Sequence, residues 1–596
     1  MKNPARLPLA AGLGGLTLLV SNGVVADNRL GPINITATRE APAVAPAMPE
    51  TVITREEIER SQARSVEDLL AGLAGLTVTN LGGPGKQSNV SIWGQSASRT
   101  AVFLDGVRIG SVSAGQTYLE HLPLTQVERI EIVRGPRSGQ WGADAGGGVI
   151  QIFTRKATEN GSNLSGGIGA GSRGQREADL RIGARQDAFD YSLGVAHSET
   201  DGFDAQSDES TDPDDDGYER DSAQLQAGYR FGDGGHVRAH AIASTAEVEY
   251  DGFYQESEIE QRTIGLSAST GRIGFWQLRA RAGRHIDDQD NIDMFGGTSR
   301  FDTQRDTLFL ANDFFLGEAA TLTLGADQTD DELSSDPQYE ETERRNQALF
   351  AQVNTTLAGK LDIQGALRRD DNEQFGTANT GSLDLAYTLT EDWTLTAGYG
   401  TSFTAPSFNL LYFPGFSNPD LQPERTRTTR AGVDWQHGPY ALGFSAFHSK
   451  VRGFITPGEN PENIDRATID GAELSGTMAL DGWQTGLALT YLSTEDRKSG
   501  NRLPRQPRWS GRVDIDRTFG TFSVGTTFRG QSDSEGGRFA PDNQGFVTAD
   551  LRGSYRIDDD WRIEARVENL FDRDYQVVQG YNQAPRGVFV SLRYGR

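Results

Sequence analysis

The chain has 596 residues, of which 36% are hydrophobic and 71 are glycine, and its formal net charge is −26. Such a negative charge disfavours nucleic acid as a partner, because phosphates would be repelled. The sequence contains no cysteine, which excludes disulfides and thiolate metal sites. Its seven histidines are scattered and make no convincing metal set.

The first 26 residues have the pattern of a secretory signal. Lys2 and Arg6 precede an apolar run from Leu9 to Val20, and a small-residue ending closes at Ala26. The run is too short for a comfortable membrane span. We therefore expect cleavage after Ala26.

Residues 27–48 are predicted to be an extended segment. The stretch Ile33–Ala37 alternates apolar and polar side chains, which suits a strand added to the sheet edge of another protein. The following residues are rich in proline and alanine, a composition typical of an extended linker.

Residues 49–157 are predicted to form a small α+β domain. Thr54 and Ser65 are each followed by acidic residues, which is the pattern of a helix start. Residues 101–104 and 127–133 have the composition of short strands.

Residues 158–596 are predicted to be all β. In residues 561–568 the odd positions are apolar and the even positions are charged, and residues 277–282 and 588–594 alternate in the same way. A soluble β-sandwich would also alternate. The pattern continues for far more than the roughly 200 to 250 residues at which soluble all-β domains usually stop.

Two further features favour a membrane barrel over the sandwich. The polar face carries full charges, as a hydrated lumen would, and Tyr191, Trp393 and Trp561 stand at strand ends, where aromatic side chains form interfacial girdles. At roughly 20 residues per strand and connection, the segment predicts about 22 antiparallel strands. A lumen of that width requires a plug, and residues 49–157 are the candidate.

Three groups of motifs resemble those of TonB-dependent outer-membrane receptors. They are the segment Val127–Thr154 (VERIEIVRGPRSGQWGADAGGGVIQIFT), the pair 91–94 and 103–108, and the closing segment 567–575. Arg134 and Arg137 with Asp144 can form charged hydrogen bonds that seat a plug against a lumen wall. Gly146, Gly147 and Gly148 permit close backbone approach there.

The resemblance implies partners and a location. It makes Ile33, Asn34, Ile35, Thr36 and Ala37 the TonB box. The implied partners are TonB with its inner-membrane energising complex, outer-membrane lipid and a small-molecule ligand, with a phage or bacteriocin as a further candidate. The implied location is the outer membrane of a Gram-negative bacterium.

Within the family, residues 367–376, 399–406 and 418–424 are similar to barrel segments of the cobalamin (vitamin B12) transporters. Siderophore receptors share the last two segments. The sequence therefore predicts TonB-dependent import of cobalamin or a related corrinoid. The alternatives are a ferric-siderophore receptor, a passive porin-like channel and an outer-membrane enzyme. No catalytic arrangement of residues stands out, and the fold would not justify one.

A calcium site is predicted in the acidic segment 212–217, where carboxylates spaced two apart could face one hard cation. In the cobalamin transporters that the chain resembles, calcium orders the loops that hold the ligand. The resemblance places Asp204, Asp212, Asp214 and Asp216 in the first such loop, and Tyr250 and Asp251 in the next. The alternative is a solvated acidic loop.

Ligand contacts are predicted by the same resemblance in the apical loops of the plug. The residues are Gln87, Asn89, Ser96, Val112 and Ser113, with Gly252 beside the acidic loops. Small polar groups suit a bulky, amide-rich ligand held by many modest hydrogen bonds. They could equally be ordinary loop residues.

Overall fold

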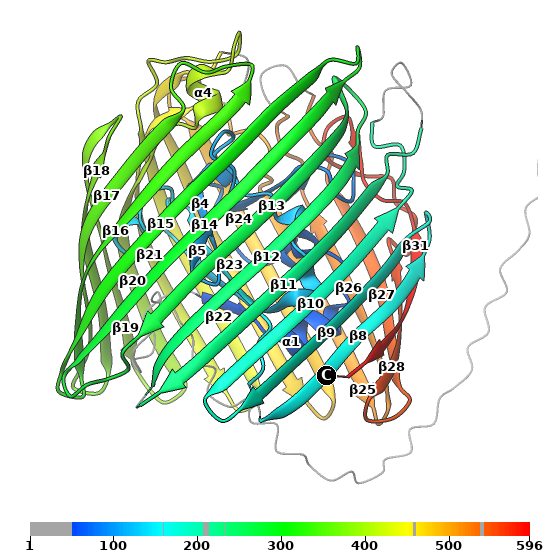
Figure 1. The fold of residues 1–596 in the computed structure, drawn as a ribbon, viewed down its shortest axis with the longest axis horizontal. Helices are drawn as coiled ribbons and strands as arrows, with labels where there is room; N and C mark the ends of the chain where they lie inside the picture. Colours follow the sequence, from blue (N-terminus) through cyan, green and yellow to red (C-terminus); the bar gives the residue numbers. More distant parts are fainter. Residues whose placement is uncertain are drawn as a thin grey trace, which may run out of the picture. The chain divides into compact units, whose positions relative to one another are not determined.

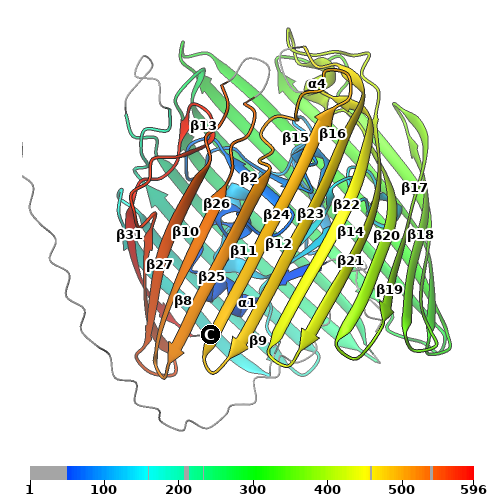
Figure 2. The ribbon, with the colours of Figure 1, turned by 180° about the vertical axis from the view of Figure 1, so that it is seen from behind.

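The computed structural model describes residues 50–158, 160–206, 214–232, 234–456, 460–536 and 541–595. In these residues a closed barrel of 22 antiparallel strands surrounds a smaller α+β domain, as Figures 1 and 2 show from opposite sides. The predicted fold class and strand number are confirmed. The predicted signal segment and Ile33–Ala37 lie outside the described residues. No helix in the described part of the chain is long and apolar enough to cross a membrane.

The inner domain, which we call the plug, is built on a five-stranded sheet with the order β1-β6-β7-β4-β5. Strands β4 and β7 pair in parallel and the other neighbours are antiparallel. A separate hairpin joins β2 and β3. The strands are β1 (Glu50–Ile53), β2 (Leu76–Asn80), β3 (Ser88–Ile92), β4 (Thr100–Leu104), β5 (Val107–Ile109), β6 (Val127–Arg134) and β7 (Gly148–Thr154). The helices are α1 (Arg55–Ser61), α2 (Val66–Leu70) and α3 (Ser138–Trp141), with short 3-10 turns η1 (Ala97–Arg99), η2 (Leu119–His121) and η3 (Leu124–Gln126).

The first two plug helices begin where the sequence predicts. The Thr54 hydroxyl accepts a hydrogen bond from the Glu57 amide, and the Glu57 carboxylate accepts one from the Thr54 amide. Ser65 caps α2 through the Asp68 amide. Each cap satisfies an amide that the helix leaves free, a contribution of about 1 kcal/mol.

The core of the plug continues into the barrel wall. Ile132 and Ile150 are fully buried between the sheet strands, and burying a side chain of this size stabilises the fold by about 1.5–3 kcal/mol. Trp93 stacks on Phe447 of the barrel with ring centroids 4.1 Å apart. The same hydrophobic cluster includes Ile469 and other barrel residues.

The barrel is an up-and-down meander in which each strand pairs with its sequence neighbours and the last strand closes on the first. Its strands are β8 (Gly161–Gly171), β9 (Arg176–Gln186), β10 (Phe189–Thr200), β11 (Tyr218–Phe231), β12 (Gly235–Glu249), β13 (Tyr254–Ser269), β14 (Trp276–Asp293), β15 (Thr298–Leu316), β16 (Ala320–Asp336), β17 (Glu343–Leu357), β18 (Leu361–Asn372), β19 (Gly376–Thr388), β20 (Trp393–Thr404), β21 (Glu424–His437), β22 (Tyr440–Ile455), β23 (Asn463–Leu480), β24 (Trp483–Asp496), β25 (Trp509–Phe519), β26 (Phe522–Gln531), β27 (Phe546–Arg556), β28 (Trp561–Glu568) and β31 (Gly587–Tyr594).

The strands expose apolar side chains outward and bury polar ones inward. On β10, Tyr191 and Leu193 are exposed, whereas the intervening Asp190 and Ser192 are buried. Trp393 and Trp561 are exposed at the first positions of β20 and β28. The outer surface therefore has the apolar face and aromatic ends of a barrel that sits in lipid.

The connections differ in length between the two ends of the barrel. At the end where the last strand finishes, the turns are short, such as 438–439 and 481–482. At the opposite end lie long loops, including 201–217, 405–423, which contains α4 (Phe408–Tyr412), and 569–586, which contains β29 (Gln576–Val578) and β30 (Tyr581–Asn582). In outer-membrane barrels the short turns are periplasmic and the long loops extracellular.

Candidate functional site

The plug's apical loop, residues 81–87 between β2 and β3, contacts Phe203 and Ala205 of the barrel loop 201–217 and Tyr218 at the start of β11. Three glycines with positive φ make the approach possible. A Cβ atom at Gly82 would lie 2.5 Å from the Ala205 Cβ, and one at Gly85 would lie 2.1 Å from the Tyr218 ring. A Cβ at Gly83 would meet the ring of the neighbouring Phe203 at 2.7 Å. The two loops are therefore complementary in shape.

Acidic residues of two neighbouring barrel loops converge above this contact. The Asp204 and Asp251 carboxylates both accept from the Gln206 amide, each at 3.1 Å. The Asp216 carboxylate accepts from the Ala205 amide at 2.7 Å. Asp251 is 8% exposed, and its Oδ1 is buried without a hydrogen-bond partner among the described residues. The structure thus places three residues of the predicted calcium set, Asp204, Asp216 and Asp251, near one another.

The pKa values of two of these carboxylates are raised. Burial, with the nearby Asp251 and Asp214, raises the pKa of Asp216 to about 7. Burial, with Asp204 and Asp214, also raises the pKa of Asp251. Burial is the main cause of both shifts, and the neighbouring negative charges add to it.

The other residues of the predicted calcium set lie around this group. Asp214 is exposed, and Asp212 falls outside the described residues. Tyr250 is half-buried against an apolar cluster, and burial raises the pKa of its hydroxyl. Its phenol therefore stays protonated at neutral pH.

A lysine of the plug reaches the base of the acidic loop, a feature that the sequence analysis missed. The Lys86 ammonium donates to the carbonyl oxygens of Asp216 and Gly217, at 2.8 and 3.0 Å. Lys86 is 1% exposed. Burial lowers the pKa of Lys86 to about 8, while Asp216, Glu249 and Asp251 act to raise it. The side chain is therefore mostly protonated at pH 7.

The predicted ligand contacts fall into two environments. Gln87, Asn89, Ser96 and Gly252 are half-buried and partly open to solvent. Val112 and Ser113 are buried under the loop 405–423, whose Asn409 amide donates to the Ser113 carbonyl at 2.9 Å. Val112 packs in the cluster that includes Phe408 of α4.

Buried ion pairs hold the plug against the strands β19 to β23. Arg99 pairs with Glu424, and Arg137 pairs with Asp384 at 2.5 Å. Arg134 lies 3.5 Å from Glu473. Arg134 and Arg137, which the sequence predicts to seat the plug, therefore both form ion pairs with the barrel. Asp144 does not pair with the lumen wall through its carboxylate.

The partner of the Asp144 side chain is instead Arg108 of the plug, at 2.6 Å. The contact of Asp144 with the barrel is made by its amide, which donates to the Phe403 carbonyl at 2.9 Å. Nearby, a Cβ on Gly146 would lie 2.9 Å from the Ser402 hydroxyl, which confirms the close approach to the barrel for this glycine. Gly147 and Gly148 instead approach residues of the plug itself, such as Ile92.

The opposite flank of the plug is less closely packed. A cavity of about 360 Å³ lies beside α1 and α2, with β8, β9, β27, β28 and β31 as its outer wall. The ion pairs of Asp68 with Arg529 and Arg566, at 2.6 and 2.8 Å, cross the seam here. The cavity runs along this flank and reaches the apical loop, since Gly83, Pro84 and Gly85 also line it.

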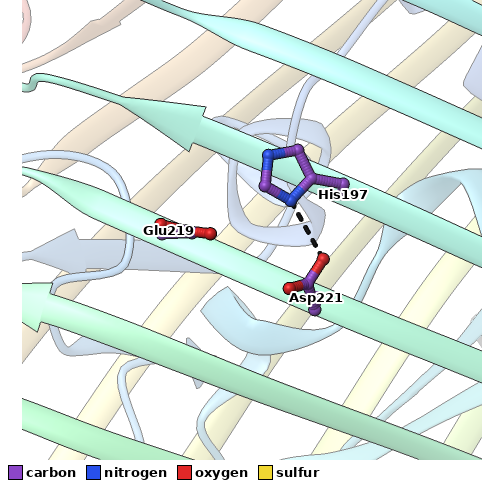
Figure 3. Close-up of side chains that lie close together, drawn as sticks. All are labelled: His197, Glu219 and Asp221. Carbon is purple, nitrogen blue, oxygen red and sulfur yellow. Dashed lines mark hydrogen bonds and ion pairs between the residues drawn. The ribbon is translucent and has the colours of Figure 1, made fainter.

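A second group of metal-ligating residues lies on the outer face of the barrel. Figure 3 shows His197 of β10 beside Glu219 and Asp221 of β11, with the His197 Nδ1 atom 2.9 Å from Asp221. Their ligand atoms all lie within 4.8 Å of one another. In the described part of the chain this is the one group that meets that limit, so the acids of the two loops stand farther apart. The outer group faces away from the plug.

Comparisons with known proteins agree with this architecture. Residues 157–570 match the family described as TonB dependent receptor-like, beta-barrel, and residues 44–149 match the TonB-dependent Receptor Plug Domain. A curated relative, the vitamin B12 transporter BtuB of Photobacterium profundum, is 27% identical over 578 residues, covering 94% of this chain and 95% of the relative. The BtuB of Vibrio cholerae is 26% identical and covers 91% and 92%.

Solved structures share the fold. The siderophore receptor PirA of Acinetobacter baumannii superposes with a TM-score of 0.79 at 18% identity, covering 92% of this chain and 98% of that chain. The ferric enterobactin receptor PfeA of Pseudomonas aeruginosa superposes with a TM-score of 0.80 at 20% identity, covering 93% and 100%. At this identity the likeness concerns the fold alone.

The closed barrel, the inner plug and the buried seam between them define a plugged receptor of the outer membrane. The chain belongs to the TonB-dependent receptor family. Membership implies TonB as a partner and a small molecule as the ligand, and the family is one of receptors and transporters rather than of enzymes.

Proposed function

We propose that this receptor imports cobalamin or a related corrinoid across the outer membrane. The observation that carries the proposal is the convergence of Asp204, Asp216 and Asp251 from two neighbouring loops above the plug's apex. Two curated relatives that match nearly the whole chain are named as vitamin B12 transporters, which supports the proposal independently.

Calcium fits the chemistry of these loops. Carboxylate and carbonyl oxygens are the ligands that calcium prefers, and the unpartnered Oδ1 of the buried Asp251 has the lone pairs to accept it. Asp204, Asp214, Asp216 and Asp251 would hold the ion, with Asp212 and Tyr250 as the remaining candidates. The bound ion would supply the positive charge that lets the crowded carboxylates approach one another.

The chain's own residues would then form the ligand platform. Gln87, Asn89 and Ser96 of the plug would present polar groups to the ligand, and Gly252 of the second acidic loop would join them; all four are partly open to solvent. For Val112 and Ser113 to touch the ligand, the loop 405–423 has to move away. TonB would pair with Ile33–Ala37 on the periplasmic side and transmit energy from the proton gradient.

Equilibrium binding tests the ligand and the ion together. The purified protein in detergent is titrated with cyanocobalamin and with ferric enterobactin, each in calcium and in EDTA. We expect the protein to bind cyanocobalamin tightly but not ferric enterobactin. EDTA should weaken the binding of cyanocobalamin at least about tenfold. Asp251→Asn should weaken binding in calcium to the same extent, because it removes one formal charge and a buried ligand oxygen.

A matched variant controls for the loss of one acidic residue. Asp533→Asn removes an exposed carboxylate from the loop between β26 and β27 and should leave both titrations unchanged. Tight binding of the iron chelate alone would replace the corrinoid proposal with a ferric-siderophore receptor. If neither EDTA nor Asp251→Asn changes the affinity for cyanocobalamin, calcium has no part in ligand binding.

A further inference from the structure

Lys86 of the plug places a positive charge against the acidic loop of the barrel. The Lys86 ammonium donates to two consecutive carbonyl oxygens at the end of the loop 201–217. Those residues are bound from other sides as well, since the Gly217 amide donates to the Glu249 carboxylate at 2.7 Å. Lys86 is thus at the point where the loop joins β11.

The surroundings of Lys86 are those of a resident counter-ion. The carboxylates of Asp216, Glu249 and Asp251 all act on its charge, and almost none of its side chain is exposed. A buried ammonium is costly unless it is hydrogen-bonded and near opposite charge. Here both conditions are met by residues of the barrel and not of the plug.

The contact also depends on the position of the plug. Gly82, Gly83 and Gly85 bring the apical loop against Ala205, Phe203 and Tyr218 with no room for a Cβ atom. Lys86 follows directly in the chain, so its ammonium reaches the carbonyl oxygens only while this docking holds. The order of the barrel loop is thereby tied to the plug.

We propose that Lys86 is a built-in counter-ion that orders the described parts of the acidic loop, residues 201–206 and 214–217, on the plug and lowers the loop's affinity for divalent cations. The proposal rests on the proposed function for its calcium part only. The ammonium stabilises the loop when no divalent ion is bound. It also repels a second cation placed among the same carboxylates, because like charges a few ångströms apart interact strongly in a partly buried site.

Two measurements on the full chain in detergent test this. One is the amide hydrogen exchange of the loop 201–217 in EDTA, and the other is calcium binding by calorimetry. The variant Lys86→Met keeps the length of the side chain and removes its charge. We expect its loop to exchange about tenfold faster in EDTA, and its calcium affinity to rise by about tenfold or less.

The direction of the calcium effect separates a counter-ion from a merely structural side chain. Damage to the loop would weaken calcium binding, whereas removal of a competing charge strengthens it. Lys86→Arg keeps the charge and should restore both values toward those of the unmodified protein. Lys498→Met removes an exposed lysine from another extracellular loop and should change neither.

Loop exchange in EDTA that is unchanged in Lys86→Met would overturn the proposal, as would weaker calcium binding in that variant. If the unmodified protein binds no calcium at all, the calcium part of the proposed function fails. The exchange of the loop in EDTA still decides whether Lys86 orders it.

Discussion

His121 shows how burial at the seam between plug and barrel changes a single residue. Its Nδ1 atom lies 3.2 Å from the Tyr218 hydroxyl. Burial, with the nearby Arg220, lowers the pKa of His121 to about 3. Two neighbouring plug carboxylates respond in the opposite sense, since burial raises the pKa values of Glu67 and Glu120.

A pH dependence follows from His121. The unfolded chain takes up a proton near pH 6.5, but the folded plug does not until about pH 3. Stability from neutral His121 is therefore full above pH 6.5 and is lost as the pH falls below it, by about 2 kcal/mol at pH 5. The free energy of local opening, measured by hydrogen exchange of residues 118–124, should show this loss.

The comparison with His121→Gln isolates the histidine from the two carboxylates, whose contribution grows as the pH falls. This variant should lose less stability than the unmodified protein between pH 7.5 and pH 5. The control is His437→Gln, which changes an exposed histidine at the periplasmic end of β21. Equal losses in the unmodified protein and His121→Gln would contradict the assignment.

At the scale of elements, the docking of the plug's apical loop depends on glycine. Gly85→Ala places a Cβ atom 2.1 Å from the Tyr218 ring at a positive φ. Gly274→Ala has the same backbone strain, with φ +63, but its Cβ meets open space. Positive φ alone costs about 1–2 kcal/mol. The difference between the two variants is therefore the cost of moving the apical loop away from Tyr218, the first residue of β11.

We expect Gly85→Ala to accelerate amide exchange in the loop 201–217 and to weaken ligand binding by at least about tenfold. Gly274→Ala should change neither. Calorimetry and hydrogen exchange on the two variants measure both effects. If Gly85→Ala exchanges like Gly274→Ala, the contact between the apical loop and the acidic loop does not order the latter.

The loop 405–423 covers part of the predicted ligand platform. A Cβ atom on Gly115 would lie 2.8 Å from the Ser407 Cβ, about 1 Å inside the usual spacing in a disulfide. Gly115→Cys with Ser407→Cys should therefore bridge the loop to the plug, and the chain has no other cysteine to interfere.

The oxidised double variant should bind ligand at least about tenfold more weakly than its reduced form, because Val112 and Ser113 stay covered. Each single cysteine variant, treated with the same oxidant, is the control. Equal affinity of the oxidised and reduced forms would show that Val112 and Ser113 do not contact the ligand.

At the scale of the whole molecule, binding and energised transport should be separable. Deletion of Ile33–Ala37 removes the predicted TonB box but no residue of the described barrel or plug. It should abolish uptake into cells and leave equilibrium binding unchanged. Deletion of Pro42–Pro46, which has the same length and lies in the predicted linker, is the matched control and should retain most of the uptake. Uptake that survives the first deletion would favour a passive channel.

The barrel was predictable because its signal is local and repeated. In a strand, neighbouring side chains point to opposite faces, so the alternation in residues 561–568 already separates an apolar outer face from a charged inner one. The helix starts at Thr54 and Ser65 were predictable for a similar reason, since a cap involves residues within one turn.

The partners across the plug–barrel seam were not predictable in the same way. Arg137 could be placed at the seam from its motif, but Asp384 lies 247 positions away in the chain. The pairing of Asp144 with Arg108 was missed, because a carboxylate near two arginines gives no sign of which cation it meets. His197 and Asp221 became neighbours only through the register of β10 with β11.

The sequence by itself therefore determined a barrel with an inner plug, its family and the acidic composition of the extracellular loops, all of which are written in local periodicity and contiguous motifs. Only the tertiary structure decided that the Lys86 ammonium of the plug binds the carbonyl oxygens of the acidic loop and that α4 covers Val112 and Ser113. The physical reason is that these contacts join segments far apart in the chain, and their geometry exists only once the barrel has closed around the plug.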